Sequence, residues 1–341
     1  MDSIYLPSGY VDVDKLLAPK IFSKIFFVGP RGSGKSYGIL KNLTVDHSDV
    51  PGFYVRTTKV ELENLFDPEL FPWGDLNMDL GLNYTIKKRN QNLAMITRTP
   101  ESEEIICLCA ALSTISQVRG MNARKYKYIF YDEFIPEAHV RKMRKQGEAV
   151  KQMYETLNRN RELQGEDPMR LILAANSNDI NNDVLVEYGL VDEVLKMREK
   201  DIELKDFPER RLRIVYPMHS PIAAAKAETA GYKNESGDYS LMALGNQFVR
   251  FYDGNIKSLN LKDFDPLVRI GSLGIYKSKS NRRLYVSSNN LDRFPESFGL
   301  TDYELGRFRM KYHRMQLAYY KKRMRFESAA CEIAFVNLWQ K

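Results

Sequence analysis

The chain has 341 residues, 43% of them hydrophobic and 28% charged, which suits a globular protein of two domains and excludes a small disulfide-stapled protein. No apolar run approaches the roughly 18 residues that span a bilayer, and the first residues lack the basic and apolar segments of a secretion signal, so we expect a cytosolic protein without a membrane partner. The net charge of +7 is uneven, because residues 1–210 hold 29 Lys and Arg against 32 Asp and Glu, whereas residues 211–341 hold 22 against 12. This pattern favours a catalytic domain followed by a domain that binds a polyanion, with a solvated basic face as the alternative.

The first motif combines a strand, a glycine-rich loop and a helix at residues 25–38, with the sequence IFFVGPRGSGKSYG. It fits the pattern G-x-x-x-x-G-K-[ST], in which glycines let successive backbone amides turn toward phosphate groups. Lys35 would reach the β- and γ-phosphates of ATP, and the Ser36 hydroxyl would bind Mg²⁺. The predicted nucleotide-binding residues are Gly29, Pro30, Arg31, Gly32, Ser33, Gly34, Lys35, Ser36 and Tyr37.

Between the loop and the next motif, the patterns predict a strand at 51–57, a hairpin at 83–97 and a strand at 104–112. Cys107 and Cys109 alternate in the last of these, which favours buried core thiols over a zinc site, since zinc would need a C-x-x-C pair and further ligands. The four histidines are scattered. We therefore expect no structural metal.

The second motif, YKYIFYDEF at residues 126–134, is an apolar strand that ends in two adjacent carboxylates. Beside a phosphate-binding loop, one such acid can hold Mg²⁺ while its neighbour faces the attacking water. Asp132 takes the first role and Glu133 the second, as general base. Solvated acids at a strand end are the alternative.

After this pair the sequence predicts a polar helix at 141–162 and a strand at 171–177. Asn176, at the end of that strand, is a candidate for contact with the γ-phosphate, with a helix cap as the alternative. A charged stretch at 199–213 indicates a linker, residues 214–247 look irregular, and residues 266–291 predict a two-stranded hairpin that turns near Ser280.

The tail opens with a capping box, Thr301 and Glu304, and predicts two helices. The expected division of the chain is an ATPase domain at 1–205, a linker at 206–230 and a basic domain at 231–341.

The segments GPRGSGKS, YIFYDEF, NRNRE and AANSN resemble the DNA-packaging ATPases of tailed double-stranded-DNA phages, and the short chain and Arg31 between the loop glycines are most similar to the φ29-like packaging motors. The resemblance covers the first 200 residues well and the rest in outline. It implies an α/β fold with two domains. The first is a P-loop NTPase domain of the additional-strand, conserved-glutamate (RecA-like) class with a mostly parallel sheet, and the second is a smaller α+β domain, an RNase H-like vestigial nuclease.

The same resemblance implies a homo-oligomeric ring, a pentamer in the φ29-like motors, that uses ATP and Mg²⁺ to drive double-stranded DNA through a portal into a procapsid in the host cytoplasm. A structural RNA is a further candidate partner, and the sequence leaves the need for it open. Arg159, in Asn158-Arg159-Asn160-Arg161-Glu162, matches the family's trans-acting arginine finger. Arg161 is the alternative finger, and exposed helix charges are the alternative to both. The candidate catalytic residues are Glu133, Arg159, Lys59, Arg31 and Asn176, of which Lys59 resembles a second trans-acting cation.

The second domain departs from an active nuclease of this fold. Two-metal cleavage needs several converging carboxylates, but residues 266–291 contain no Asp or Glu. The same stretch carries basic residues, namely Arg269, Lys277, Lys279, Arg282 and Arg283. We therefore expect a nuclease-inactive domain that grips nucleic acid or docks on the portal.

Four other functions compete with the motor. A nucleotide kinase would need a substrate lid and would not need Glu133. A terminase with an active nuclease would need metal-binding acids that residues 266–291 of this sequence lack. A helicase or other nucleic-acid-dependent ATPase would also have an acid pair such as Asp132 and Glu133. Such an enzyme usually has a second RecA-like core or further motifs, and this sequence shows neither. A non-enzymatic nucleic-acid-binding protein with a nucleotide switch is the fourth.

Overall fold

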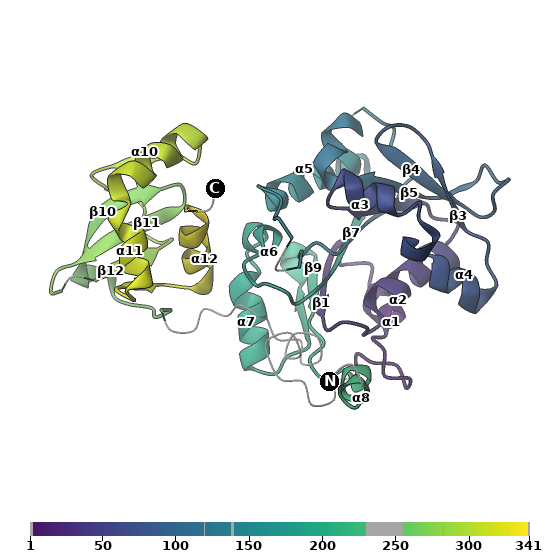
Figure 1. Cartoon of the computed structure of the whole chain (residues 1–341), viewed down its shortest axis with the longest axis horizontal. Helices are drawn as coiled ribbons and strands as arrows, with labels where there is room; N and C mark the ends of the chain where they lie inside the picture. Colours follow the sequence, from purple (N-terminus) through teal and green to yellow (C-terminus); the bar gives the residue numbers. More distant parts are fainter. Residues whose placement is uncertain (1–2, 119, 138–139, 230–254, 282, 340–341) are drawn as a thin grey trace. The chain divides into compact units, whose positions relative to one another are not determined.

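The computed structural model describes residues 3–118, 120–137, 140–229, 255–281 and 283–339. The chain divides into two compact units, one formed by residues 1–187 and 194–249 and the other by residues 188–193 and 250–341 (Figure 1). In the described part of the chain, no helix is long and apolar enough to cross a membrane.

The larger unit is built on a nine-stranded sheet with the order β3-β4-β5-β2-β6-β7-β1-β9-β8. The six strands from β5 to β9 in this order run parallel, and β4, β3 and β8 add antiparallel edges. The predicted mostly parallel sheet is therefore confirmed. The strands are β1 (Lys24–Gly29), β2 (Gly52–Arg56), β3 (Thr85–Lys88), β4 (Leu93–Thr97), β5 (Ile105–Ala111), β6 (Tyr128–Asp132), β7 (Arg170–Asn176), β8 (Leu204–Phe207) and β9 (Leu212–Val215).

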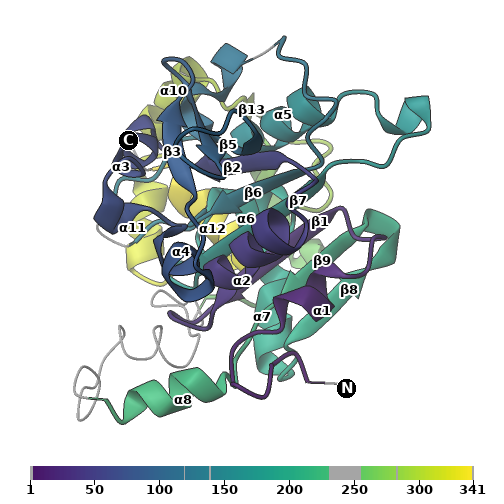
Figure 2. The same cartoon turned by 90° about the vertical axis from the view of Figure 1, so that its right-hand side faces the viewer.

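Helices cover both faces of this sheet. Phe26 and Phe27, which point to opposite faces of β1, are both fully buried. Figures 1 and 2 show α2 close to β1. The helices of the first 230 residues are α1 (Val13–Leu17), α2 (Lys35–Lys41) with a π-helical extension (Asn42–Asp46), α3 (Lys59–Asn64), α4 (Gly74–Leu80), α5 (Gln146–Asn158), α6 (Asp183–Glu187), α7 (Val191–Glu199) and α8 (Pro221–Ala227).

The predicted linker differs from the structure, because β8 and β9 continue the sheet where a linker was expected. Arg213 on β9 makes two 2.7 Å bonds to the carboxylate of Asp206 on β8. Charged residues that indicated a linker thus pair with each other between two antiparallel strands. This pairing allows the segment to form part of the sheet. The other predicted boundary, at residue 231, lies outside the described residues.

The smaller unit has a five-stranded mixed sheet with the order β13-β10-β11-β12-β14, covered by α10, α11 and α12. Its core includes Phe308, Phe326 and Phe335, all fully buried. An α+β unit in this place agrees with the prediction, and its RNase H-like character stays a prediction. The elements are β10 (Phe264–Ile270), β11 (Leu273–Ser278), β12 (Leu284–Ser287), β13 (Ser297–Phe298), α10 (Asp302–Tyr312), α11 (Arg314–Tyr320), β14 (Met324–Phe326) and α12 (Ala329–Asn337).

Two details of this unit correct the sequence interpretation. Residues 264–287 form three antiparallel strands rather than a two-stranded hairpin, because Gly271, with a φ of 52°, makes an additional turn before β11. The tail contains three helices and a strand rather than two helices, since β14 pairs with β12 between α11 and α12. The predicted cap is present, with Thr301 Oγ1 accepting a bond from the Glu304 amide at 3.3 Å.

Candidate nucleotide-binding and catalytic site

The loop between β1 and α2 has the backbone that phosphate binding requires. Gly32 and Gly34 have φ angles of 71° and 82°, a left-handed region that side chains disfavour. A Cβ atom on Gly34 would also lie 3.0 Å from the ring of Tyr10. Because α2 begins at Lys35, directly after the loop, its first amides and the positive end of its dipole face the loop.

Lys35 is buried in this loop, with 6% of its surface exposed. Its Nζ lies 2.7 Å from the Pro30 carbonyl oxygen, 3.1 Å from that of Gly29 and 3.3 Å from the Ser33 hydroxyl. Burial lowers the pKa of Lys35 to about 7, although the nearby carboxylates act in the opposite direction. A buried ammonium held by neutral oxygens would be stabilised strongly by phosphate charge.

Asn176, at the end of β7, lies beside this ammonium. Its Oδ1 is 3.3 Å from Lys35 Nζ, and the register that pairs it with Gly29 places it at the mouth of the loop. The structure thus brings Asn176 to the predicted phosphate site.

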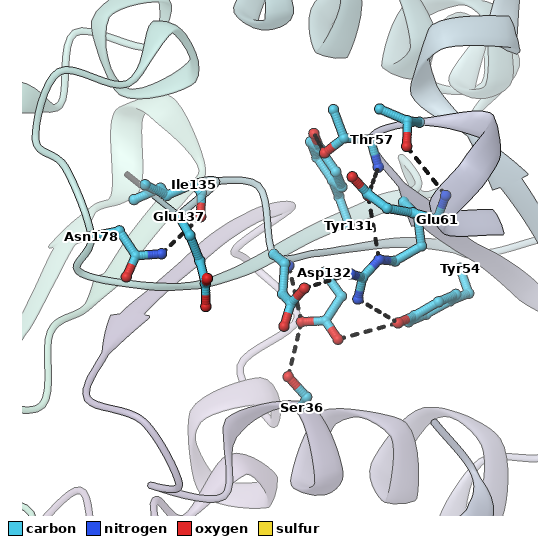
Figure 3. Close-up of polar contacts among 12 residues, drawn as sticks. Ser36, Tyr54, Thr57, Glu61, Tyr131, Asp132, Ile135, Glu137 and Asn178 are labelled. Carbon is cyan, nitrogen blue, oxygen red and sulfur yellow. Dashed lines mark hydrogen bonds and ion pairs between the residues drawn. The ribbon is translucent and has the colours of Figure 1, made fainter. Parts of the chain in front are cut away.

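Ser36 and Asp132 meet across the sheet edge, as Figure 3 shows. The Ser36 hydroxyl donates to Asp132 Oδ1 at 2.9 Å, and the Tyr54 hydroxyl donates to Oδ2 at 3.3 Å. Burial raises the pKa of Asp132, so a cation at this carboxylate would stabilise its charged form. A hydroxyl and a carboxylate are oxygen ligands that Mg²⁺ prefers, and the pair therefore fits the predicted metal site.

Glu133 follows β6 with a φ of 54°, and its side chain is 55% exposed. Its carboxylate forms an ion pair with Arg56, at the end of β2. Arg56 is itself held by Tyr54, whose hydroxyl accepts from Nη1 at 3.4 Å, and by Glu61, 3.6 Å from Nε. Release from Arg56 would free this carboxylate oxygen to accept a proton from water.

The sequence analysis did not predict a role for Arg56, although Arg56 lies only three residues before the candidate Lys59. The signal that could have found it is geometric. The end of β2 lies beside the end of β6 in a parallel sheet, so Arg56 at the end of β2 and Glu133 just after β6 become neighbours.

Buried amides hold the segment after Glu133. Asn178 Nδ2 donates to the Ile135 carbonyl at 3.3 Å, and Asn182 Nδ2 donates to that of Phe134 at 3.1 Å (Figure 3 draws the former). Gln146 also donates to the Phe134 carbonyl, at 2.8 Å. These bonds fix the chain that leaves the candidate general base.

Arg31 and Lys59 both pair with carboxylates. The Arg31 guanidinium forms an ion pair with Glu137, and Lys59, exposed at the start of α3, lies 3.8 Å from Glu63. Their predicted catalytic roles stay predictions.

Arg159 and Arg161 differ sharply in burial. Arg159 is exposed at the end of α5, where it donates to the Met121 carbonyl at 2.8 Å. Arg161 has a side chain only 5% exposed. Its guanidinium donates to three backbone carbonyls, those of Ala123, Arg124 and Tyr126. Arg161 therefore has a structural role, and Arg159 is the exposed one of the two.

A cavity of about 660 Å³ runs beside α2, a size that suits a base and a ribose. Tyr37, Gly38 and Lys41 line it from the helix, and Tyr10 lines it from the N-terminal segment. The Val11 amide donates to the Ser33 carbonyl at 3.0 Å, so this segment is tied to the phosphate-binding loop. The N-terminal contribution was not predicted, whereas Tyr37 was.

No protein-family model and no curated protein matches the sequence. Among solved structures, the Phi-28 gp11 DNA packaging motor is similar over 96% of this chain and 97% of its own, with a TM-score of 0.62 and 16% identity. The bacteriophage Phi-29 viral genome packaging motor assembly is similar over 99% of both chains, with a TM-score of 0.63 and 17% identity. Across nearly its whole length, the chain therefore has the fold of these phage DNA-packaging motors, with a larger α/β unit on a mostly parallel sheet and a smaller α+β unit.

Proposed function

We propose that the protein is an ATP-hydrolysing ring motor that translocates double-stranded viral DNA into a procapsid. The observation that carries this proposal is the convergence of the Lys35 loop, the Ser36–Asp132 pair and Glu133 at one sheet edge, within a fold shared with packaging motors along the whole chain. The proposal places the protein in the host cytoplasm with a portal and a procapsid as partners, and a structural RNA is a further candidate partner.

In this proposal the loop amides and Lys35 bind the phosphates of ATP, and Ser36 and Asp132 hold Mg²⁺. The ion would neutralise charge on the phosphate oxygens. Glu133 accepts a proton from the attacking water, and Asn176 contacts the γ-phosphate. In the proposed homo-oligomeric ring, a pentamer, Arg159 and Lys59 serve the site of a neighbouring subunit, a role with which their exposed positions agree.

The experiment that tests this function measures ATP hydrolysis by the full chain with procapsids and DNA, together with the amount of DNA protected from nuclease. We expect hydrolysis to rise when both are present and DNA to become protected. The Lys35→Ala protein should show neither effect. Hydrolysis that DNA and procapsids leave unchanged would contradict a motor and favour a nucleotide switch.

We further propose that the smaller unit binds a polyanion and does not cut it. Lys277, Lys279 and Arg283 are exposed around the turn between β11 and β12, and Arg282 lies outside the described residues. A cavity of about 300 Å³ beside this turn is lined by Lys279, Arg283 and Arg325. Clustered cations around a concave surface suit phosphate groups.

The proposal that this unit does not cut nucleic acid rests on the lack of Asp and Glu in residues 266–291. Over the residues that the structure describes, no group of three or more His, Cys, Asp or Glu side chains is placed to hold a metal ion. Asp265, on β10, lies 3.7 Å from Lys279. Asp253, a second acid that an active nuclease could use as a metal ligand, lies outside the described residues.

Replacement of Lys277, Lys279, Arg282 and Arg283 by Ala should weaken binding of the full chain to duplex DNA and flatten its salt dependence. Each lost phosphate contact should reduce the slope of log affinity against log salt by about 0.9, with little change in sequence preference. Filter binding across a salt series checks this. An unchanged slope would indicate a protein-docking domain, and Mg²⁺- or Mn²⁺-dependent nicking of plasmid would indicate an active nuclease.

A further inference from the structure

Helix α8 follows β9, the last strand of the larger sheet along the chain, and its Lys226 side chain reaches the phosphate-binding loop. Ser220 caps this helix by accepting a bond from the Ala223 amide at 3.4 Å. The chain that leads to it touches the loop, since a Cβ on Gly29 would lie 2.8 Å from the Pro217 ring. The N-terminal segment supports it from outside, where a Cβ on Gly9 would lie 3.0 Å from Pro221.

Lys226, in the last turn of α8, places its ammonium directly against the loop. A Cβ on Gly32 would lie only 1.8 Å from Lys226 Nζ. The same ammonium is 3.5 Å from the Arg31 carbonyl oxygen, the outer limit of a hydrogen bond. Lys226 also lines the 660 Å³ cavity, together with Gly32 and Gly34.

The positive charge of Lys226 lies near that of Lys35. Within the described ranges, no carboxylate lies within ion-pair distance of its ammonium. Its charge also acts on Lys35, whose pKa it helps to lower, after the larger effect of burial. Two ammonium groups thus lie at one glycine-rich loop, and their mutual repulsion would be relieved by an anion bound between them.

We propose that Lys226 is a second phosphate-binding residue of the nucleotide site, which contacts the phosphate chain from α8 within the same subunit. This inference rests on the proposed ATPase function. Gly32 must then lack a side chain for two reasons, its left-handed φ and the room that the Lys226 ammonium needs.

The test measures the affinity of the full chain for fluorescent ATP and ADP analogues, with Mg²⁺, at several salt concentrations. A charge-assisted hydrogen bond to phosphate predicts that Lys226→Ala and Lys226→Gln each weaken binding by about tenfold or more. Both should also reduce the salt dependence of binding, and Lys226→Arg should restore most of the affinity. Lys151→Ala, which removes a surface lysine of α5 paired with Glu187, should bind as the wild type does.

Thermal unfolding without nucleotide separates binding from folding, and all four variants should unfold near the wild-type temperature. Wild-type affinity in Lys226→Gln, or no recovery in Lys226→Arg, would overturn the role of Lys226. Lys35→Ala distinguishes that failure from a failure of the proposed function. If Lys35→Ala also binds nucleotide normally, the loop is not a nucleotide site at all.

Discussion

Lys35→Ala and Glu133→Gln should fail at different steps of the ATPase cycle. Lys35→Ala removes the buried ammonium that four oxygens surround in the loop, so we expect nucleotide binding to be lost. Glu133→Gln keeps the shape of the side chain but removes its proton acceptor, so ATP should bind while hydrolysis falls by about 10²- to 10⁴-fold. Equilibrium binding and single-turnover hydrolysis measure the two effects separately.

Surface variants of the same residue types provide matched controls. Lys151 and Glu155 both lie exposed on α5, and Lys151→Ala and Glu155→Gln should bind and hydrolyse ATP at wild-type levels. An equal loss of ATP affinity in Lys35→Ala and Glu133→Gln would contradict the division of roles. Normal hydrolysis by Glu133→Gln would show that another group accepts the proton.

Much of the candidate site could be predicted because its chemistry is concentrated in short segments. The loop before Lys35 and the acids after the strand at 128–132 carry their own local patterns. Parallel strands then bring their carboxyl ends to one edge, which is why Asp132 and Asn176 lie beside the loop. The strands of the larger sheet could be predicted in the same way, because buried strands appear in the sequence as short apolar runs.

The parts that were missed depend on contacts between distant segments. Arg56 reaches Glu133 only through the pairing of β2 with β6. Lys226 reaches the loop through a helix almost 200 residues further along the chain. The pairing of Arg213 with Asp206 converts a charged segment into a strand pair, and composition alone cannot indicate that arrangement.

The exposure of the side chains distinguishes Arg159 from Arg161, which the sequence left as alternative arginine fingers. Arg161 and Arg159 are two residues apart in a polar segment, so either could serve as a finger. The Arg161 guanidinium donates to three backbone carbonyls, and its side chain is only 5% exposed. Its replacement would remove these three bonds and would destabilise the fold, whereas replacement of Arg159 should not.

Arg159→Ala should therefore abolish most hydrolysis by the assembled ring while leaving ATP binding by isolated subunits almost intact. Arginine fingers supply about 10³- to 10⁵-fold in rate, because their charge reaches the transition state of the neighbouring site. Binding of a fluorescent ATP analogue by the monomer and steady-state hydrolysis by the ring measure the two properties. Thermal unfolding should show wild-type stability for Arg159→Ala and a clear loss for Arg161→Ala.

Mixed rings test whether the Arg159 charge acts between subunits. An Arg159→Ala subunit retains Glu133, and a Glu133→Gln subunit retains Arg159, so an interface between them in the correct order contains both groups. In an equal, random mixture about one head-to-tail interface in four should be complete, and hydrolysis should recover although each variant alone is inactive. A mixture no more active than its components, or a wild-type monomer as active as the ring, would show that Arg159 does not act in trans.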